Sequence, residues 1–189
     1  MAADAHARTL PAPLGFALVT VSDSRRGGDD LSGPRAAELV AAAGQRVVER
    51  LAVDDEVGAI RPAVSALLAR PDVDVVVLTG GTGVAPRDRT PEAVEPLLDR
   101  LLPGFGETFR QLSFAEIGPA AMLSRALAGV AAPPRGVAKA VFALPGSPPA
   151  VELALERLIL PAAAHLLAQA RRPAGEAGDA ADATDGGRL

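Results

Sequence analysis

Short, compact apolar runs alternate along the chain with longer segments in which apolar residues recur at helical spacing. The compact runs predict β-strands, because apolar runs of about four to eight residues between turn signals are typical of buried strands. The predicted strands cover residues 15–22, 46–53, 73–79 and 137–144. In the third, Val75 to Leu78 are apolar without interruption, which indicates a strand covered on both faces. The pattern therefore predicts a parallel central strand.

The segments with helical spacing lie between and after these strands. The first opens with Ser32-Gly-Pro34 and stops at Gly44, which are typical signals of a helix start and a helix end. The other predicted helices cover residues 56–69, 91–102, 104–114 and 149–170. Residues 123–131 fit either a helix or a strand, and residues 23–31 are expected to form a loop.

This alternation predicts an α/β fold, with a mostly parallel central sheet and helices on both faces. The length of 189 residues fits a single domain. We expect the domain to cover residues 14–171, after a flexible N-terminus at residues 1–13. Residues 172–189 are rich in Ala, Gly, Asp and Thr with almost no large apolar residue, which predicts a disordered tail.

Small, glycine-rich and acidic residues follow the predicted strands at their carboxyl ends. Ligands of open α/β sheets bind at this edge, so we expect residues 22–23, 80–88 and 145–147 to meet there. Asp54 and Asp55 follow the second strand at the same edge. A crevice with carboxylates and several helix N-termini suits a phosphate-bearing ligand with Mg²⁺.

The glycine-rich turn follows the central strand directly. Because Gly80, Gly81 and Gly83 lack a Cβ, their backbone N–H groups can adopt positive φ and close around a phosphate. Thr90 followed by Pro91 predicts the N-cap and first turn of a helix, whose positive end would lie beside the loop. The loop lacks the Gly-Lys-Ser/Thr ending of a P-loop, which argues against a generic nucleoside triphosphatase.

Composition excludes several other classes of protein. The chain has no cysteine, so disulfides, thiolate zinc sites and cysteine nucleophiles are excluded. A net charge of -4 and the lack of Trp and Tyr argue against a nucleic-acid groove. The apolar runs are shorter than the roughly 18 residues that a membrane helix needs, so we expect a cytoplasmic protein without a membrane span. His6 and His165 lie in a predicted tail and on an apolar helix, which do not suit metal ligands.

Several separate motifs occur in order along residues 15–169. They are Thr79-Gly-Gly-Thr-Gly83, Arg87-Asp88, Thr90-Pro-Glu-Ala93, Pro103-Gly-Phe-Gly-Glu107, Leu123-Ser-Arg125 and Leu144-Pro-Gly-Ser147. In order and spacing they resemble the MogA/MoaB family of molybdenum cofactor biosynthesis proteins. Residues 30–33 and 105–118 look more like the MoaB branch of that family.

The resemblance implies a molybdopterin-binding α/β fold that assembles as a trimer or, in many MoaB members, a hexamer formed as a dimer of trimers. Active members of the family adenylate molybdopterin with ATP and Mg²⁺ and release pyrophosphate. Molybdopterin, ATP and other molybdenum cofactor biosynthesis proteins are thus the implied partners. A non-catalytic molybdopterin-binding or scaffold protein of the same pathway remains the alternative.

The resemblance also implies roles for individual residues. The two aspartates that active members need map to Asp54 and Asp88, as catalytic and Mg²⁺-holding residues, with Asp55 left as the alternative to Asp54. Further binding residues carried over from the family are Ser22, Gly80, Gly81, Thr82, Gly83, Glu107, Ser124, Pro145, Gly146 and Ser147. No general-base histidine is required, because phosphoryl transfer depends on positioning and charge neutralisation.

Each of these positions also has a purely structural interpretation. The glycine loop fits a tight strand-to-helix turn without a ligand. Asp54 and Asp55 fit a surface turn or a helix cap, and Asp88 fits a salt-bridged loop acid. Ser147 is expected to cap a helix, which is compatible with ligand contact. Ser124 and Arg125 fit structural roles as well as functional ones.

Overall fold

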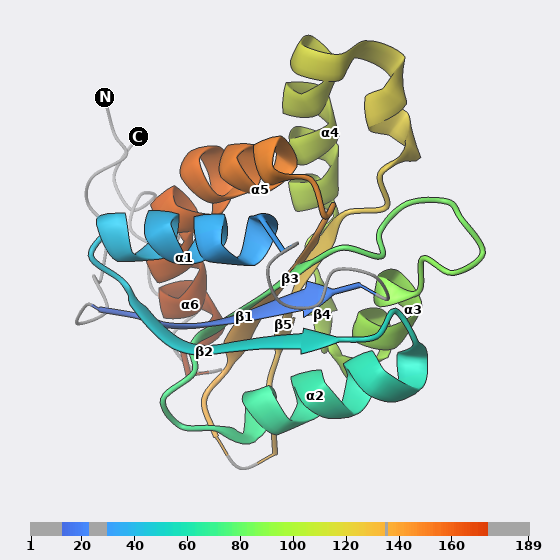
Figure 1. Ribbon diagram of the computed structural model, residues 1–189. Coiled ribbons are helices and arrows are strands. Elements are labelled where there is room, and N and C mark those ends of the chain that lie inside the picture. The colour runs from blue at the N-terminus through green and yellow to red at the C-terminus, as the bar shows by residue number, and fades with distance from the viewer. Residues whose placement is uncertain (1–12, 23–29, 135, 174–189) are drawn as a thin grey trace, which may run out of the picture.

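The computed structural model describes residues 13–22, 30–134 and 136–173 of the chain. They form one six-stranded sheet with the strand order β2-β1-β3-β6-β5-β4 (Figure 1). The strands are β1 (Gly15–Val21), β2 (Arg46–Val53), β3 (Val75–Thr79), β4 (Arg100–Leu101), β5 (Leu127–Ala131) and β6 (Lys139–Leu144). The predicted flexible N-terminus and disordered tail fall almost entirely outside the described residues, as do Asp23 and His6.

Helices cover both faces of the sheet, as predicted (Figure 1). They are α1 (Ser32–Ala42), α2 (Val57–Ala69), α3 (Thr90–Val94), α4 (Pro103–Ile117), α5 (Pro148–Ala154) and α6 (Leu160–Ala170), with the 3₁₀ and π-helical segments η2 (Glu95–Leu97), η3 (Gly118–Leu123) and η4 (Leu155–Ile159). None of the helices in the described ranges is long and apolar enough to cross a lipid bilayer.

Two apolar clusters lie on opposite faces of the sheet, and the alternating side chains of β3 contribute to both. Val75 and Val77 pack in the cluster under α1, α5 and α6, whereas Val76 and Leu78 pack in the cluster over α2 and α3. All four side chains are fully buried. Because β1, β2, β3 and β6 run parallel, the mostly parallel sheet and the central position of β3 are confirmed.

The far edge of the sheet differs from the prediction. Residues 123–131, which fitted either a helix or a strand, supply β5, and β5 runs antiparallel to β6. The helix predicted at residues 91–102 ends early, because α3 stops at Val94 and residues 100–101 form β4 against β5. Pro96, within η2, has no backbone N–H with which to continue a helix.

Two predicted helices in the C-terminal half of the chain also differ from the observed ones. The helix expected at 104–114 is longer and runs from Pro103 to Ile117. The helix expected at 149–170 is interrupted by the π-helical turn η4. Pro161 lies in the first turn of α6, and a proline in this position cannot donate a hydrogen bond to the preceding turn.

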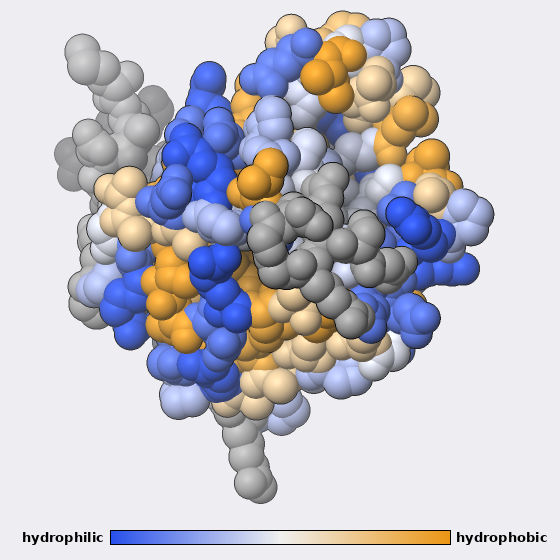
Figure 2. All heavy atoms as spheres, viewed as in Figure 1, coloured by the Kyte–Doolittle hydropathy of each residue, from blue (hydrophilic) through white to orange (hydrophobic). Residues whose placement is uncertain are grey.

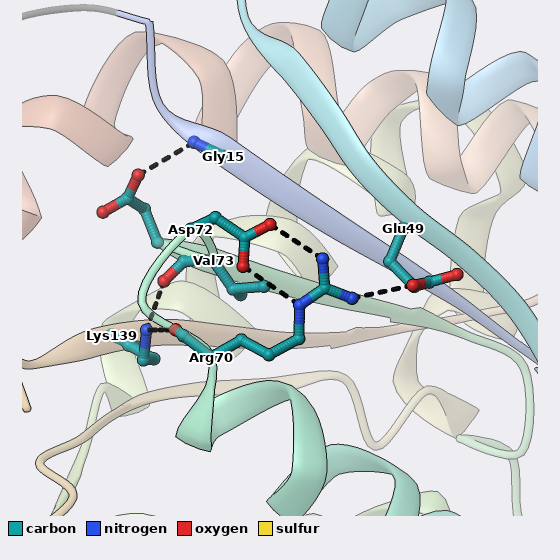
Figure 3. A network of polar contacts seen from close by, with 7 residues as sticks. Gly15, Glu49, Arg70, Asp72, Val73 and Lys139 are labelled. Atoms are coloured by element: carbon teal, nitrogen blue, oxygen red, sulfur yellow. Dashed lines mark hydrogen bonds and ion pairs between the residues drawn. The ribbon is translucent and has the colours of Figure 1, made fainter.

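A polar network around the buried Lys139 lies at the edge of the sheet where the parallel strands begin (Figure 3). Lys139, the only lysine in the chain, is 2% exposed, and its Nζ donates to the carbonyls of Arg70, at 2.6 Å, and Val73. The Arg70 guanidinium pairs with Asp72 and with Glu49, each at 2.7 Å. The network ties the end of α2 to the start of β3 and β6.

Lys139 makes the free energy of unfolding depend on pH in the alkaline range. Burial lowers the pKa of Lys139, although the nearby Asp74 opposes this shift. The folded-state pKa then lies below the unfolded value, so the unfolded chain binds more protons between the two, and stability rises with pH in that window. A neutral amine still has two N–H donors for the two carbonyls.

We therefore expect the stability difference between the wild type and Lys139→Met to grow as the pH rises through the alkaline range towards the ordinary lysine value of about 10.4. At neutral pH the variant should already be about 1–3 kcal/mol less stable, because the carbonyls of Arg70 and Val73 lose their donor. Urea unfolding at a series of pH values measures both effects. A stability difference that does not change with pH would contradict the lowered pKa.

Candidate functional site

The carboxyl ends of the parallel strands surround a cavity of about 390 Å³, which we call the acidic cavity. The residues predicted from the sequence that line it are Ser22, Gly80, Gly81, Asp88, Pro145, Gly146 and Ser147. The convergence expected for these three segments is therefore observed in the described residues. Further lining residues, not singled out from the sequence as site residues, include Thr20, Asp30, Ser32, Thr79 and Arg87.

A second cavity of about 290 Å³ adjoins the first, and we call it the apolar cavity. The two cavities share Gly81, Asp88 and residues 145–147. The predicted residues Thr82, Gly83 and Ser124 line the apolar cavity. Its other walls include Phe109, Ile117 and Leu123 from α4 and η3. Asp88 therefore lies where a polar and an apolar compartment meet.

The structure does not bring Glu107 to either cavity. Glu107 is exposed on α4 and lines a separate depression of about 230 Å³ together with Pro103 and Arg110. Its place in the Pro103–Glu107 motif gave no indication of which side of the helix it would occupy.

Of the two acids after β2, Asp55 lines the acidic cavity and Asp54 does not. Asp55 is only 8% exposed and accepts a hydrogen bond from the backbone N–H of Arg89 at 2.9 Å. A Cβ at Gly81 would lie 2.6 Å from its carboxylate oxygens. Asp55, and not Asp54, therefore occupies the position next to the glycine loop for which the sequence named Asp54.

The glycine loop needs its glycines for two different reasons. Gly80 and Gly81 have φ values of +112° and +63°, as expected for residues without a Cβ. Gly83 does not have a positive φ, contrary to the prediction, but a Cβ there would lie 2.7 Å from Asp88 Oδ2. Asp88 Oδ2 also accepts from the backbone N–H of Ala85 at 2.8 Å, which folds the loop back on itself.

The expected helix dipole beside this loop is not supported. Arg89, not Thr90, is the N-cap residue of α3, and α3 has only 5 residues. The Thr90 hydroxyl instead donates to the carbonyl of Gly80 at 2.8 Å. Thr90 therefore fixes the loop rather than capping the helix.

The comparisons with known proteins agree with this geometry. Residues 17–165 match the family model described as "Probable molybdopterin binding domain". The chain is 44% identical to molybdenum cofactor biosynthesis protein B of Halalkalibacterium halodurans over 168 residues, which cover 88% of this chain and 96% of that protein. The chain belongs to the MogA/MoaB family. A role in molybdenum cofactor biosynthesis follows from this membership.

Solved structures of the MogA/MoaB family share the fold. A crystal structure of molybdenum cofactor biosynthesis protein B has a TM-score of 0.80 and 43% identity, and the match covers 87% of this chain and 100% of that one. The tungsten cofactor synthesizing protein MoaB from Pyrococcus furiosus has a TM-score of 0.75 and 37% identity, over 86% and 100% of the two chains. Both names agree with the expected likeness to the MoaB branch.

The start of α1 is not available to an anion in this MogA/MoaB chain. Asp30 Oδ1 accepts from the backbone N–H groups of Ser32, at 3.1 Å, and Gly33, at 2.9 Å. Asp30 Oδ2 accepts from the Thr20 hydroxyl at 2.7 Å. The Asp30-Leu-Ser-Gly33 sequence is typical of such a capped helix start, because an Asp just before a helix commonly accepts hydrogen bonds from the first N–H groups. An anion would therefore find its donors in the glycine loop.

Thr79, at the end of β3, offers a buried hydroxyl in the lining of the acidic cavity. It is 3% exposed, and its Oγ1 is the one buried side-chain polar atom of the described residues that lacks a hydrogen-bond partner. A buried hydroxyl without a partner carries a free-energy penalty of about 1–3 kcal/mol. A bound ligand that offers a hydrogen bond here would remove that penalty.

The donor set fits a magnesium ion that arrives with a phosphate ligand. Within residues 13–22, 30–134 and 136–173 no group of three or more His, Cys, Asp or Glu side chains forms a complete metal cage. Mg²⁺ is commonly held by one or two carboxylates plus substrate phosphates and water. Asp55 and Asp88 line the same cavity and supply carboxylates of this kind.

Ser147 lies at the start of a helix, as predicted, but does not make the predicted capping hydrogen bond. It is the N-cap residue of α5, yet it makes no side-chain capping hydrogen bond. Ser147 lines both cavities. It therefore lies in the wall that the acidic and apolar cavities share.

Proposed function

We propose that the chain binds molybdopterin and adenylates it with MgATP, releasing pyrophosphate. The observation that carries this proposal is the pair of cavities that meet at Asp88. One is rich in carboxylates and hydroxyls, which suits phosphates and their metal ion. The other has Phe109, Ile117 and Leu123 in its walls, which suits a flat ring system.

The reaction needs two phosphate groups to meet without a proton acceptor from the protein. The terminal phosphate of molybdopterin attacks the α-phosphorus of ATP, a new P–O bond forms, and the bond to the leaving pyrophosphate breaks. Because the attacking phosphate is already anionic, positioning and charge neutralisation dominate. Magnesium bound with the nucleotide would neutralise phosphate charge.

The residues of the chain supply the positioning. The Gly80 N–H already donates to the carbonyl of Leu144, so the backbone N–H groups of residues 81–83 are proposed to hold phosphate oxygens, and Asp55 and Asp88 to hold Mg²⁺. Arg87 also lines the acidic cavity and is proposed to offset negative charge on the triphosphate. Ser22, Ser124 and Ser147 are proposed to contact the pterin or the nucleotide.

The test is an assay of the purified protein with molybdopterin, ATP and Mg²⁺, in which adenylated molybdopterin is detected by mass. Product that requires all three components is the expected result. Bound molybdopterin without product under any metal condition would overturn the enzymatic proposal and leave the non-catalytic binding protein.

We also propose that the chain acts in the cytoplasm as a trimer or a dimer of trimers, in contact with other proteins of the pathway. The family resemblance supports this assembly. So does the arm formed by α4 and η3, which projects from the body and carries exposed apolar side chains (Figures 1 and 2). They are Phe114, Ile117, Met122 and Leu123. A monomeric mass measured by light scattering would contradict the proposed trimer or dimer of trimers.

Thr79→Val should have opposite effects on stability and on ligand binding. The change keeps the side-chain shape and removes the unpartnered hydroxyl, so the free protein should be equally stable or up to about 1 kcal/mol more stable. If a ligand hydrogen-bonds this hydroxyl, its affinity should fall about 5- to 10-fold, as expected for one neutral hydrogen bond. Thermal unfolding and titration with molybdopterin or ATP measure the two effects. An unchanged affinity for both ligands would show that Thr79 is not a contact.

A further inference from the structure

Arg125, in the link between η3 and β5, contacts both ends of the segment from Gly83 to Asp88, which continues the glycine loop. Its Nε donates to the carbonyl of Gly83 at 2.7 Å, and its Nη2 donates to the carbonyl of Asp88 at 2.6 Å. Its backbone N–H donates to the carbonyl of Thr82 at 2.7 Å. One residue therefore holds three carbonyls of the segment that carries Asp88.

The segment between these contacts has few other bonds of its own. Residues 84–87 are exposed to solvent. Within the segment, Asp88 and Ala85 exchange two hydrogen bonds, from Ala85 N–H to Asp88 Oδ2 at 2.8 Å and from Asp88 N–H to Ala85 O at 2.9 Å. These bonds shape the turn but do not attach it to the rest of the protein. Among the described residues, the side chain of Arg125 attaches the segment to the rest of the protein, and directly after the segment the N–H of Arg89 donates to Asp55.

Glu92 holds the third guanidinium nitrogen of Arg125. The Nη1 of Arg125 lies 2.6 Å from Glu92 Oε1, and this hydrogen bond lowers the pKa of Glu92. Glu92 lies on α3, whose Ala93 and Val94 are fully buried. Arg61 of α2 donates to the carbonyl of Glu92 at 2.9 Å, which fixes α3 in turn. The carboxylate that orients Arg125 is therefore itself anchored to the core.

We propose that Arg125, oriented by Glu92, is a positioning residue that closes the segment from Gly83 to Asp88 and thereby fixes Asp88 between the two cavities. The contacts require arginine specifically, because its planar fork presents donors to three acceptors in different directions. A lysine has a single nitrogen and cannot reach all three at once. The consequence for catalysis rests on the proposed adenylation, whereas the closure of the loop does not.

Trypsin tests the closure without any ligand, because two trypsin sites, Arg87 and Arg89, flank Asp88 at the end of the segment. The variants are Arg125→Gln and Arg125→Lys, with Glu92→Gln as a milder change that leaves the arginine in place. The matched control is Arg35→Gln, since Arg35 is 38% exposed against 36% for Arg125 and also pairs with carboxylates, those of Glu152 and Glu38, which belong to helices and not to the glycine loop. Circular dichroism and thermal unfolding establish that each variant is folded.

Both Arg125 variants should be cleaved after Arg87 and Arg89 about tenfold or more faster than the wild type, as followed by mass spectrometry, because strong hydrogen bonds that close the segment are lost. Glu92→Gln should give a smaller increase, and Arg35→Gln none. Cleavage of Arg125→Gln at the wild-type rate, or equal protection in Arg125→Lys and the wild type, would overturn the proposal.

Steady-state kinetics separates this proposal from the proposed function. If the chain adenylates molybdopterin, both Arg125 variants should lose kcat, by about tenfold or more, with a much smaller change in the KM for ATP, because a misplaced Asp88 affects the transition state most. A loss confined to KM would overturn the positioning role. If the wild type makes no product, the proposed function fails, while faster cleavage of the variants would still support the closure of the loop by Arg125.

Discussion

Asp55→Asn is expected to lower the rate of molybdopterin adenylation by at least about 100-fold, whereas Asp54→Asn is expected to stay within about 3-fold of the wild type. The first value corresponds to about 3 kcal/mol of lost charge stabilisation at a metal-assisted phosphoryl transfer. Asp55 lines the acidic cavity and Asp54 does not. The substitution keeps the size of the side chain and removes its charge.

This pair of variants is well matched, because the two acids are adjacent and receive the same change. Folding is checked by thermal unfolding, since Asp55 also accepts a hydrogen bond from the Arg89 N–H. Raising the Mg²⁺ concentration should partly restore Asp55→Asn if the lost carboxylate held the ion. Equal losses in both variants, or a loss confined to Asp54→Asn, would refute the assignment of the metal-holding role to Asp55.

The fold could largely be predicted from the apolar pattern, because the parallel strands are buried on both faces and their runs are continuous. β3 is the clearest case, since Val75, Val76, Val77 and Leu78 are all fully buried. β4 could not be predicted in this way. Its two residues are exposed and are held by pairing with Gly129 and Val130, far away in the sequence, so their own pattern carries no strand signal.

The candidate site was predictable where the backbone alone defines it. The glycines and the turn at residues 145–147 follow strand ends whose register brings them together, with Thr79 opposite Leu144 in the sheet. Side-chain direction after a strand end was not predictable. This is why Asp54 and Asp55 could not be told apart, and why Glu107 was grouped with residues that lie elsewhere.

Arg125 shows a different limit of sequence reasoning. Its place in the Leu123-Ser-Arg125 motif marked it as a candidate, but its partners Gly83 and Asp88 are about forty residues earlier in the chain. A single sequence does not show which carbonyls a guanidinium will reach. The two cavities depend on such long-range contacts, since their shared residues come from separate loops.

Gly80→Ala is expected to be the most destabilising substitution in the glycine loop, at a cost of about 3 kcal/mol or more. Gly80 has a φ of +112°, and a Cβ there would lie 2.1 Å from the carbonyl oxygen of Val21. This oxygen belongs to the backbone of β1 and cannot move without disturbing the sheet. Both the backbone conformation and the contact therefore oppose the change.

Two other glycines separate these contributions. Gly44 has a φ of +72° with nothing within 4 Å of an added Cβ, so Gly44→Ala should cost only the roughly 1–2 kcal/mol of a left-handed residue. Gly58 lies in α2, has no positive φ and also has open space, so Gly58→Ala should stabilise by about 0.5 kcal/mol. Thermal unfolding should therefore rank Gly58→Ala above the wild type, then Gly44→Ala, then Gly80→Ala.

The ranking also bears on the acidic cavity. The contact between Gly80 and Val21 joins the glycine loop to the end of β1, and both residues line that cavity. If Gly80→Ala is no less stable than Gly44→Ala, the loop can move away from β1 at little cost, and the tight approach is not a constraint of the fold. If Gly80→Ala is much less stable, the absence of a side chain at Gly80 is what allows the glycine loop to lie against the end of β1 in the wall of the acidic cavity.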